Sequence, residues 1–173
     1  MIQKQTKSRG FTIVELLIVI IVIAILAAIT IVAYNGVQNR AHSSAQKSTA
    51  VSLAKKLEAF NAVGGVYPTS NTAALMTTAL NGGPAEAVLT GSGITLGTPA
   101  AGTADSVVQL RTCAAGAQTA GTTVPTGYVV YIWDATLTTP GLNPVQAGGI
   151  GSITAGATGV ANTATCTNAY TAA

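Results

Sequence analysis

The chain begins with a short polar, basic stretch, and a long run of apolar residues follows it. The run covers residues 11–34, and Glu15 is its only charged residue. A helix of these residues rises about 36 Å at about 1.5 Å per residue, enough to cross a hydrocarbon core of about 30 Å. We therefore expect residues 11–34 to form a membrane-spanning helical segment, with Glu15 inside the bilayer.

An apolar stripe continues the helical pattern beyond this segment. No strong helix breaker occurs until Gly64 and Gly65, although Gly36 is a weak point at which the helix could kink. The stripe follows a three-four spacing and consists of Ala50, Leu53, Leu57 and Phe60. The pattern predicts one helix over residues 11–63, about 80 Å long. Its amphipathic half, residues 35–63, packs this stripe against a globular head.

After Gly65 the chain changes to short elements separated by Gly, Pro and Thr. A short helix is expected over residues 71–80, and residues 107–111 and 128–133 are rich enough in β-branched and aromatic side chains to predict strands. A sheet must bury one face against another layer. We therefore predict an α+β fold, in which a head over residues 64–173 lays about four antiparallel strands over the stripe of the long helix.

The last part of the head is free of charge. Residues 135–173 contain no Asp, Glu, Lys, Arg or His and are mostly Thr, Ala and Gly. Disordered segments normally combine high net charge with few apolar residues. The composition therefore favours an ordered, loop-rich surface that contacts identical neighbours, with disorder as the alternative.

Charge gives no sign of a nucleic-acid partner. The whole formal net charge of +3 comes from three residues before Gly10: Lys4, Lys7 and Arg9. The rest of the chain is balanced and has no basic stripe that could neutralise phosphates. The one basic group beyond the apolar run is interpreted as the solvated face of a helix: Lys47, Lys55 and Lys56.

Three other kinds of segment share part of the N-terminal pattern. A secretory signal peptide has an apolar region of roughly 7–15 residues, shorter than this one, although residues 26–28 form a weak cleavage site for it. A plain anchor with a cytoplasmic N-terminus fits the length and the basic flank. It leaves Glu15 unexplained, because an acid at such depth costs about 2.5 kcal/mol or more. The core helix of a soluble protein rarely has so long an apolar run with one charge.

Residues 7–16 resemble the class III leader junction of type IV pilins and their relatives. They combine a basic leader, Gly10 followed by Phe11, an acid five residues after Gly10, and the long apolar run. The resemblance implies that a dedicated membrane peptidase cuts between Gly10 and Phe11. It also implies that the leader, residues 1–10, is lost and that Phe11 becomes a methylated N-terminus.

The chain departs from many bacterial pilins within the apolar run. Those proteins carry a proline and an earlier glycine there, between which the helix melts in the filament, whereas this chain has Val32 and Ala24. Without a proline to remove a backbone hydrogen bond, we expect the helix to stay continuous in an assembled fibre. Glu15 is expected to direct assembly, by pairing with the new amine of Phe11 on a neighbouring subunit.

The only two cysteines, Cys113 and Cys166, lie beyond the membrane segment. Two cysteines in an oxidising compartment most economically pair with each other. A bridge closing this loop of about 50 residues stabilises the head by about 4 kcal/mol in the chain-entropy model. The arrangement also resembles the disulfide-bounded C-terminal loop of many type IV pilins. Two unpaired buried thiols are the alternative.

No catalytic or cofactor pattern stands out. His42 is the only histidine and is interpreted as a solvated helix residue, since a catalytic histidine needs a nucleophile and a carboxylate in a cleft. The cysteines and His42 lack zinc-site spacing, and no glycine-rich loop has the Lys-Ser or Lys-Thr ending of a phosphate cradle. We expect no enzyme activity, cofactor or metal.

The resemblance implies a structural subunit of a type IV pilus or pilus-like surface filament that polymerises with identical subunits through its N-terminal helix. Its expected partners are the prepilin peptidase, an inner-membrane assembly platform and the membrane. The subunit would span the cell membrane once before assembly and then join an extracellular filament. The alternative is a pseudopilin of a type II secretion or DNA-uptake system. Major secretion pseudopilins commonly bind calcium through C-terminal acidic residues, which residues 135–173 lack.

Overall fold

The computed structural model describes residues 10–68, 73–113, 125–138, 140–149, 152–154, 163–165 and 169–171. The predicted leader up to Arg9, and Cys166, lie outside the described residues. The chain divides into two compact units, Met1–Gln38 and Asn39–Ala173.

The helix α1 extends over Ile13–Gly64 and confirms the prediction of one long helix. Gly36 does not interrupt it, and it is helical throughout between Ala24 and Val32. It ends where Gly65 adopts φ +72° and donates its N–H to the carbonyl of Asn61 at 2.7 Å. This is a left-handed C-cap, which glycine adopts without steric cost.

In the first unit, α1 is apolar on all sides. Every residue from 10 to 38 is exposed, including Phe11 with 81% of its surface accessible. A helix that is apolar all round is stable only inside a large core or a membrane. Among the described residues, α1 is the one helix whose length and composition suit a membrane span. These features are consistent with membrane insertion.

In the second unit, the predicted stripe of α1 forms the centre of the core. Ala50, Leu53 and Leu57 are fully buried, and Phe60 packs against them. The helix α2 (Ala73–Asn81) adds Met76 and Leu80 to this core. Residues 71 and 72, the predicted start of the short helix, lie outside the described residues.

A single-turn 3₁₀ helix, η1 (Ala85–Ala87), follows α2. Just before it, Gly83 lies against the ring of Phe60, and a Cβ added there would force that ring to shift. Lys56 on α1 donates to the carbonyl of Val88 at 2.7 Å and to that of Glu86 at 3.3 Å. Lys47 and Lys55 are exposed, as expected for the solvated face of a helix, whereas Lys56 is half-buried and its ammonium binds carbonyls on η1 and just after it.

The main sheet is small and mostly antiparallel. Its strands are β1 (Thr95–Leu96), β2 (Val107–Cys113), β3 (Gly127–Asp134), β4 (Gly141–Gly148) and β7 (Ala169–Thr171). The order is β1-β2-β3-β4, and β7 also pairs with β2. Only the β1–β2 pairing in this sheet is parallel. A separate antiparallel pair is formed by β5 (Ser152–Thr154) and β6 (Thr163–Thr165). The predicted strands at 107–111 and 128–133 are thus confirmed as β2 and β3.

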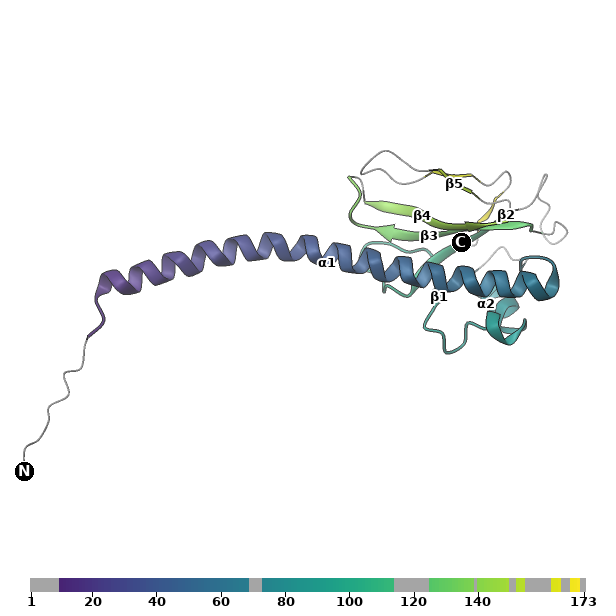
Figure 1. Ribbon diagram of the computed structural model, residues 1–173, viewed down its shortest axis with the longest axis horizontal. Coiled ribbons are helices and arrows are strands. Elements are labelled where there is room, and N and C mark those ends of the chain that lie inside the picture. Colours follow the sequence, from purple (N-terminus) through teal and green to yellow (C-terminus); the bar gives the residue numbers. More distant parts are fainter. Residues whose placement is uncertain are drawn as a thin grey trace, which may run out of the picture. The chain divides into compact units, whose positions relative to one another are not determined.

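The sheet covers the stripe of α1, as the sequence predicts. Figure 1 shows β2, β3 and β4 beside the C-terminal half of α1. Alternate residues of β2 and β3 enter the same core as the stripe: Val108, Leu110, Tyr128, Val130 and Ile132. This alternation is the period of a strand that turns one face inward.

The strand β4 lies within the charge-free region and carries an irregularity. Its register with β3 shifts between Val130 and Tyr131, beside Pro144. Proline has no N–H to donate to the ladder, so strands accommodate it at edges or bulges. The described parts of residues 135–173 thus include four strands, β4 to β7. Contact of this region with identical neighbours stays a prediction.

Candidate functional site

The predicted cleavage junction lies immediately before α1. Gly10 and Phe11 are exposed and precede the first helical residue, Ile13. No atom lies within 4 Å of the position that a Cβ on Gly10 would occupy. The bond between Gly10 and Phe11 therefore lies in non-helical backbone with open space around Gly10, a geometry that suits a peptidase.

The start of α1 is a capping box formed by Thr12 and Glu15. The Glu15 carboxylate accepts the Thr12 N–H at 2.8 Å and its hydroxyl at 2.7 Å, and the Thr12 hydroxyl accepts the Glu15 N–H at 3.2 Å. A reciprocal pair of this kind satisfies N–H groups that have no partner inside the helix. Sequence reasoning assigned Glu15 to assembly and missed this contact, although the pattern Thr-x-x-Glu is its usual signature. Glu15 therefore has a structural contact in the single chain, while its role in assembly stays a prediction.

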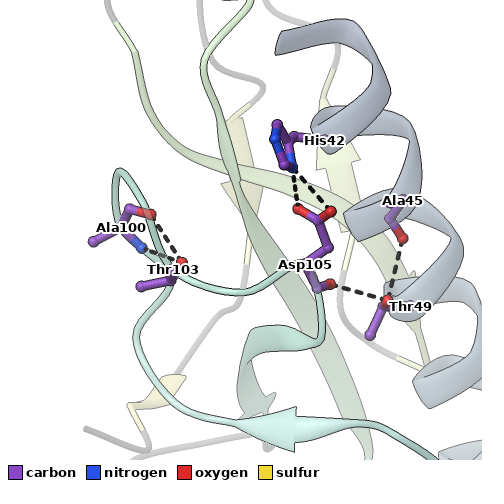
Figure 2. A network of polar contacts seen from close by, with 6 residues as sticks. All are labelled: His42, Ala45, Thr49, Ala100, Thr103 and Asp105. Atoms are coloured by element: carbon purple, nitrogen blue, oxygen red, sulfur yellow. Dashed lines mark hydrogen bonds and ion pairs between the residues drawn. The ribbon is translucent and has the colours of Figure 1, made fainter. Parts of the chain in front are cut away.

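In the head, His42 pairs with Asp105, as Figure 2 shows. His42 Nδ1 lies 3.0 and 2.9 Å from the two carboxylate oxygens of Asp105. The His42 side chain is 54% exposed, so the description of it as solvated is correct but omits its partner. Thr49 also donates to the carbonyl of Asp105 at 3.1 Å. Together these contacts attach the loop before β2 to α1.

Asp134, at the end of β3, is a buried carboxylate that sequence reasoning did not single out. It is 2% exposed and accepts hydrogen bonds from the Thr136 N–H at 2.9 Å, the Thr136 hydroxyl at 2.6 Å and the Asn143 amide at 3.0 Å. Lys47 lies 3.8 Å away and is half exposed. Burial alone raises the pKa of Asp134. The hydrogen bonds from Thr136 and Asn143 and the charge of Lys47 lower that pKa by more than burial raises it, so the net shift is downward. This cluster holds the connection between β3 and β4 in place, and Lys47 is not simply a solvated residue.

A second polar cluster joins α1 to the sheet through Glu58. The Tyr67 hydroxyl donates to both carboxylate oxygens of Glu58 at 3.1 Å, and the Tyr67 and Tyr128 rings meet edge to face with their centroids 5.2 Å apart. Burial, and then the hydrogen bond and charge of Glu58, raise the pKa of Tyr67 to about 12. The same causes raise the pKa of Tyr128.

These raised values predict a loss of stability in alkaline solution. A tyrosine that ionises less readily in the folded than in the unfolded state stabilises the fold fully below its ordinary pKa of about 10. That contribution is lost as the pH rises through about 12 for Tyr67. Denaturant unfolding, followed by the fluorescence of Trp133, is expected to show this decline. The double variant Tyr67→Phe, Tyr128→Phe should show a shallower one, and an equal decline in both proteins would contradict the assignment.

Cys113 ends β2 and is fully buried. It stands in register with Gly127 of β3 and with Ala169 of β7. Cys166 lies outside the described residues, three positions before Ala169 in the sequence. The bridge between Cys113 and Cys166 therefore stays a prediction, and the β2–β7 pairing is compatible with it.

Within the described residues, no group of three or more His, Cys, Asp and Glu side chains is arranged to hold a metal ion. The absence of a cofactor and of enzyme activity stays an expectation.

The architecture is that of a pilin-like α+β protein, with a long N-terminal apolar helix and a small, mostly antiparallel sheet. Residues 5–31 match the family model described as the prokaryotic N-terminal methylation motif. The chain thus carries the cleavage and methylation motif typical of type IV prepilins, and the motif supports a pilin-like or pseudopilin-like precursor. No curated protein and no solved structure matched the chain.

Proposed function

We propose that this chain is a structural subunit of a type IV pilus or pilus-like surface filament. The observation that carries the proposal is the N-terminal part of α1, which is apolar and exposed on every side and lies largely within residues 5–31, the stretch that matches the methylation motif. Exposed apolar surface of this size is stable in lipid or against other apolar helices, and not in water. A subunit that leaves the membrane must therefore bury this surface against copies of itself.

The proposed route begins in the cell membrane, which α1 spans once with the basic leader in the cytoplasm. A prepilin peptidase removes residues 1–10 and the N-terminus of Phe11 is methylated. An inner-membrane assembly platform then passes the subunit into an extracellular filament, in which the N-terminal halves of α1 form the core and the heads lie outside. The proposal assigns no enzyme activity, cofactor or metal to the subunit.

Electron microscopy of fibres sheared from the cell surface, with intact-mass analysis of their subunit, tests this function. We expect thin fibres whose main component is this chain without its leader, and none after deletion of its gene. The absence of this chain from all surface fibres would contradict the proposal. Its recovery only in a short structure that depends on a secretion or DNA-uptake apparatus would favour the pseudopilin instead.

The bridge between Cys113 and Cys166 gives a separate prediction. In the filament subunit, alkylation without reduction should modify neither cysteine, and reduction should expose both. Replacing either cysteine with alanine is expected to lower the free energy of unfolding by up to about 4 kcal/mol, because both changes release the same loop of about 50 residues.

Cys113→Ala removes a buried side chain as well as the bridge. A double-mutant cycle separates the cost of the lost packing from the cost of the lost bridge. If the cysteines are bridged, Cys113→Ala and Cys166→Ala together should cost little more than either alone. Two free thiols before reduction, or costs that simply add, would contradict the bridge.

A further inference from the structure

The end of α1 and the two residues that follow it form an exposed surface without polar side chains. Residues 62–66, which we call the tip, are all exposed and consist only of alanine, valine and glycine. Val63, near the middle of the tip, has 73% of its surface accessible. A contiguous exposed apolar surface marks an interaction site more often than scattered apolar residues do. The tip is therefore a candidate contact surface of the head.

The tip also carries the negative end of α1. The carbonyl groups in the last turn of a helix lack partners inside the helix, and a helix ends with roughly half a negative charge. A lysine or arginine in the last turn would interact favourably with that charge, but α1 has no basic residue there. The tip is therefore both apolar and electronegative, and it has no cation of its own.

A groove of about 390 Å³ opens at the other end of the part of α1 that belongs to the head (Figure 1). Its α1 wall begins at Asn39. Most of its surface is apolar, and the facing walls include Ala101 from the loop before β2 and Trp133 and Ala135 around the end of β3. Small side chains around one indole suit a compact apolar group.

Arg40 places a positive charge beside this groove. It lies on α1 between the lining residues Asn39 and His42, and it is exposed. Its guanidinium forms no ion pair within the described residues, which include all five acidic side chains of the chain. A cation in this position is complementary to the negative end of α1 at the tip.

The tip and the groove of one chain cannot meet each other. His42 and Val63 lie on one continuous helix, about 30 Å apart at about 1.5 Å per residue. Copies inserted in the membrane in the same orientation have parallel helices, so the tip of one copy can reach the groove of another displaced by about 30 Å. Such a contact joins two different surfaces, and it builds a fibre unless rotation closes it into a ring.

We propose that the tip of one copy fills the groove of a second copy, whose Arg40 faces the end of α1 of the first. This inference rests on the proposed function, because it names a contact between heads in the filament. The groove is formed before contact, since His42 holds Asp105 in its wall (Figure 2). The Thr103 hydroxyl likewise closes the turn that begins at Ala100. A preformed site loses less conformational freedom on binding.

Cysteine cross-linking in filaments tests the contact directly. Chains with Val63→Cys and with Ala101→Cys are co-expressed, and the sheared fibres are treated with a short bismaleimide. We expect a cross-linked dimer from this mixed pair and none from either variant alone, because the contact joins unlike surfaces. Val63→Cys with Ser52→Cys is the matched control and should give none, since Ser52 is exposed on the same helix away from both surfaces. The parent controls for the native Cys113 and Cys166.

Val63→Lys separates this contact from folding. A lysine in the last turn favours the end of a helix, so the head should unfold at or above the parental temperature. In the filament the same lysine enters an apolar groove beside Arg40, and with this variant as the only copy the subunit in sheared fibres should fall about tenfold or more. Val63→Ile keeps an apolar side chain and should assemble like the parent. Adding Arg40→Glu to Val63→Lys makes the facing charges opposite and should recover most of the loss.

The contact is overturned if parental filaments form but the cysteines of tip and groove do not cross-link, or if Val63→Lys assembles at the parental level. It is also overturned if Val63→Cys cross-links equally well to Ser52→Cys, which would place the tip against the middle of a neighbouring α1. In these cases filaments of the parent chain still form, so the proposed function stands. Absence of the parent chain from all surface fibres would remove the function and this contact together.

Discussion

Replacing Gly10 with valine is expected to leave the leader on the chain and to abolish filaments. The resemblance implies a peptidase that cuts after a glycine, and a β-branched residue is stiffer and wider than glycine at the bond to be cut. The fold should not be affected, because Gly10 lies before α1 with no atom near the position of an added Cβ. The subunit should therefore remain in the membrane fraction with its full precursor mass.

Gly36→Val is the matched control for this variant. Gly36 is also exposed, with open space around it, but lies inside α1 and far from the junction. Its subunit should be cut normally, begin at Phe11 and carry the added mass of one methyl group. A filament subunit that began at Met1 or after Ala28, or a Gly10→Val subunit cut as well as the parent, would contradict the predicted junction.

The elements predicted from the sequence are those with a strong local pattern. The stripe at Ala50, Leu53 and Leu57 predicts α1 because its spacing matches the period of a helix. The run of β-branched and aromatic residues in β3 predicts a strand because neighbouring residues in the sequence carry the signal. The strand β4 contains Pro144 and few β-branched residues. It becomes a strand through pairing with β3, so no local pattern reveals it.

The polar contacts of the head could not be predicted in this way. His42 and Asp105 are 63 positions apart in the sequence, and only the fold brings them together. Asp134 likewise depends on Asn143 across the β3–β4 connection. The capping box at Thr12 is different, because its residues are three apart and its signature is local.

Glu15 caps α1 in the structure and is also predicted to direct assembly, and an experiment must separate these two roles. Glu15→Gln separates them, because glutamine also serves in a capping box and so keeps the hydrogen bonds to Thr12 while removing the charge. Thr12→Ala does the reverse. It removes the capping hydroxyl, at a cost of about 1 kcal/mol, and keeps the carboxylate.

The charge is the expected determinant of assembly. Cleavage creates a positive amine on Phe11, which lies just before the start of α1 and four residues before Glu15. In the core of a filament, that amine is expected to face Glu15 of a neighbouring subunit. Removing one partner of a buried ion pair leaves the other uncompensated and costs about 3–5 kcal/mol. Because about 1.4 kcal/mol corresponds to a factor of ten, we expect Glu15→Gln to reduce incorporation about 100-fold or more.

Co-expression of each variant with the parent chain measures this effect. The fraction of variant subunit in sheared fibres, divided by its fraction in the membrane, gives incorporation at equal supply, and the mass of the membrane form shows whether cleavage still occurs. Glu15→Gln should insert, be cut and be nearly absent from fibres, whereas Thr12→Ala should enter them at close to the parental level. Equal losses in the two variants would assign Glu15 to helix capping. Incorporation of Glu15→Gln at the parental level would mean that the carboxylate reaches the membrane interface without a partner, and the assembly role would have to be dropped.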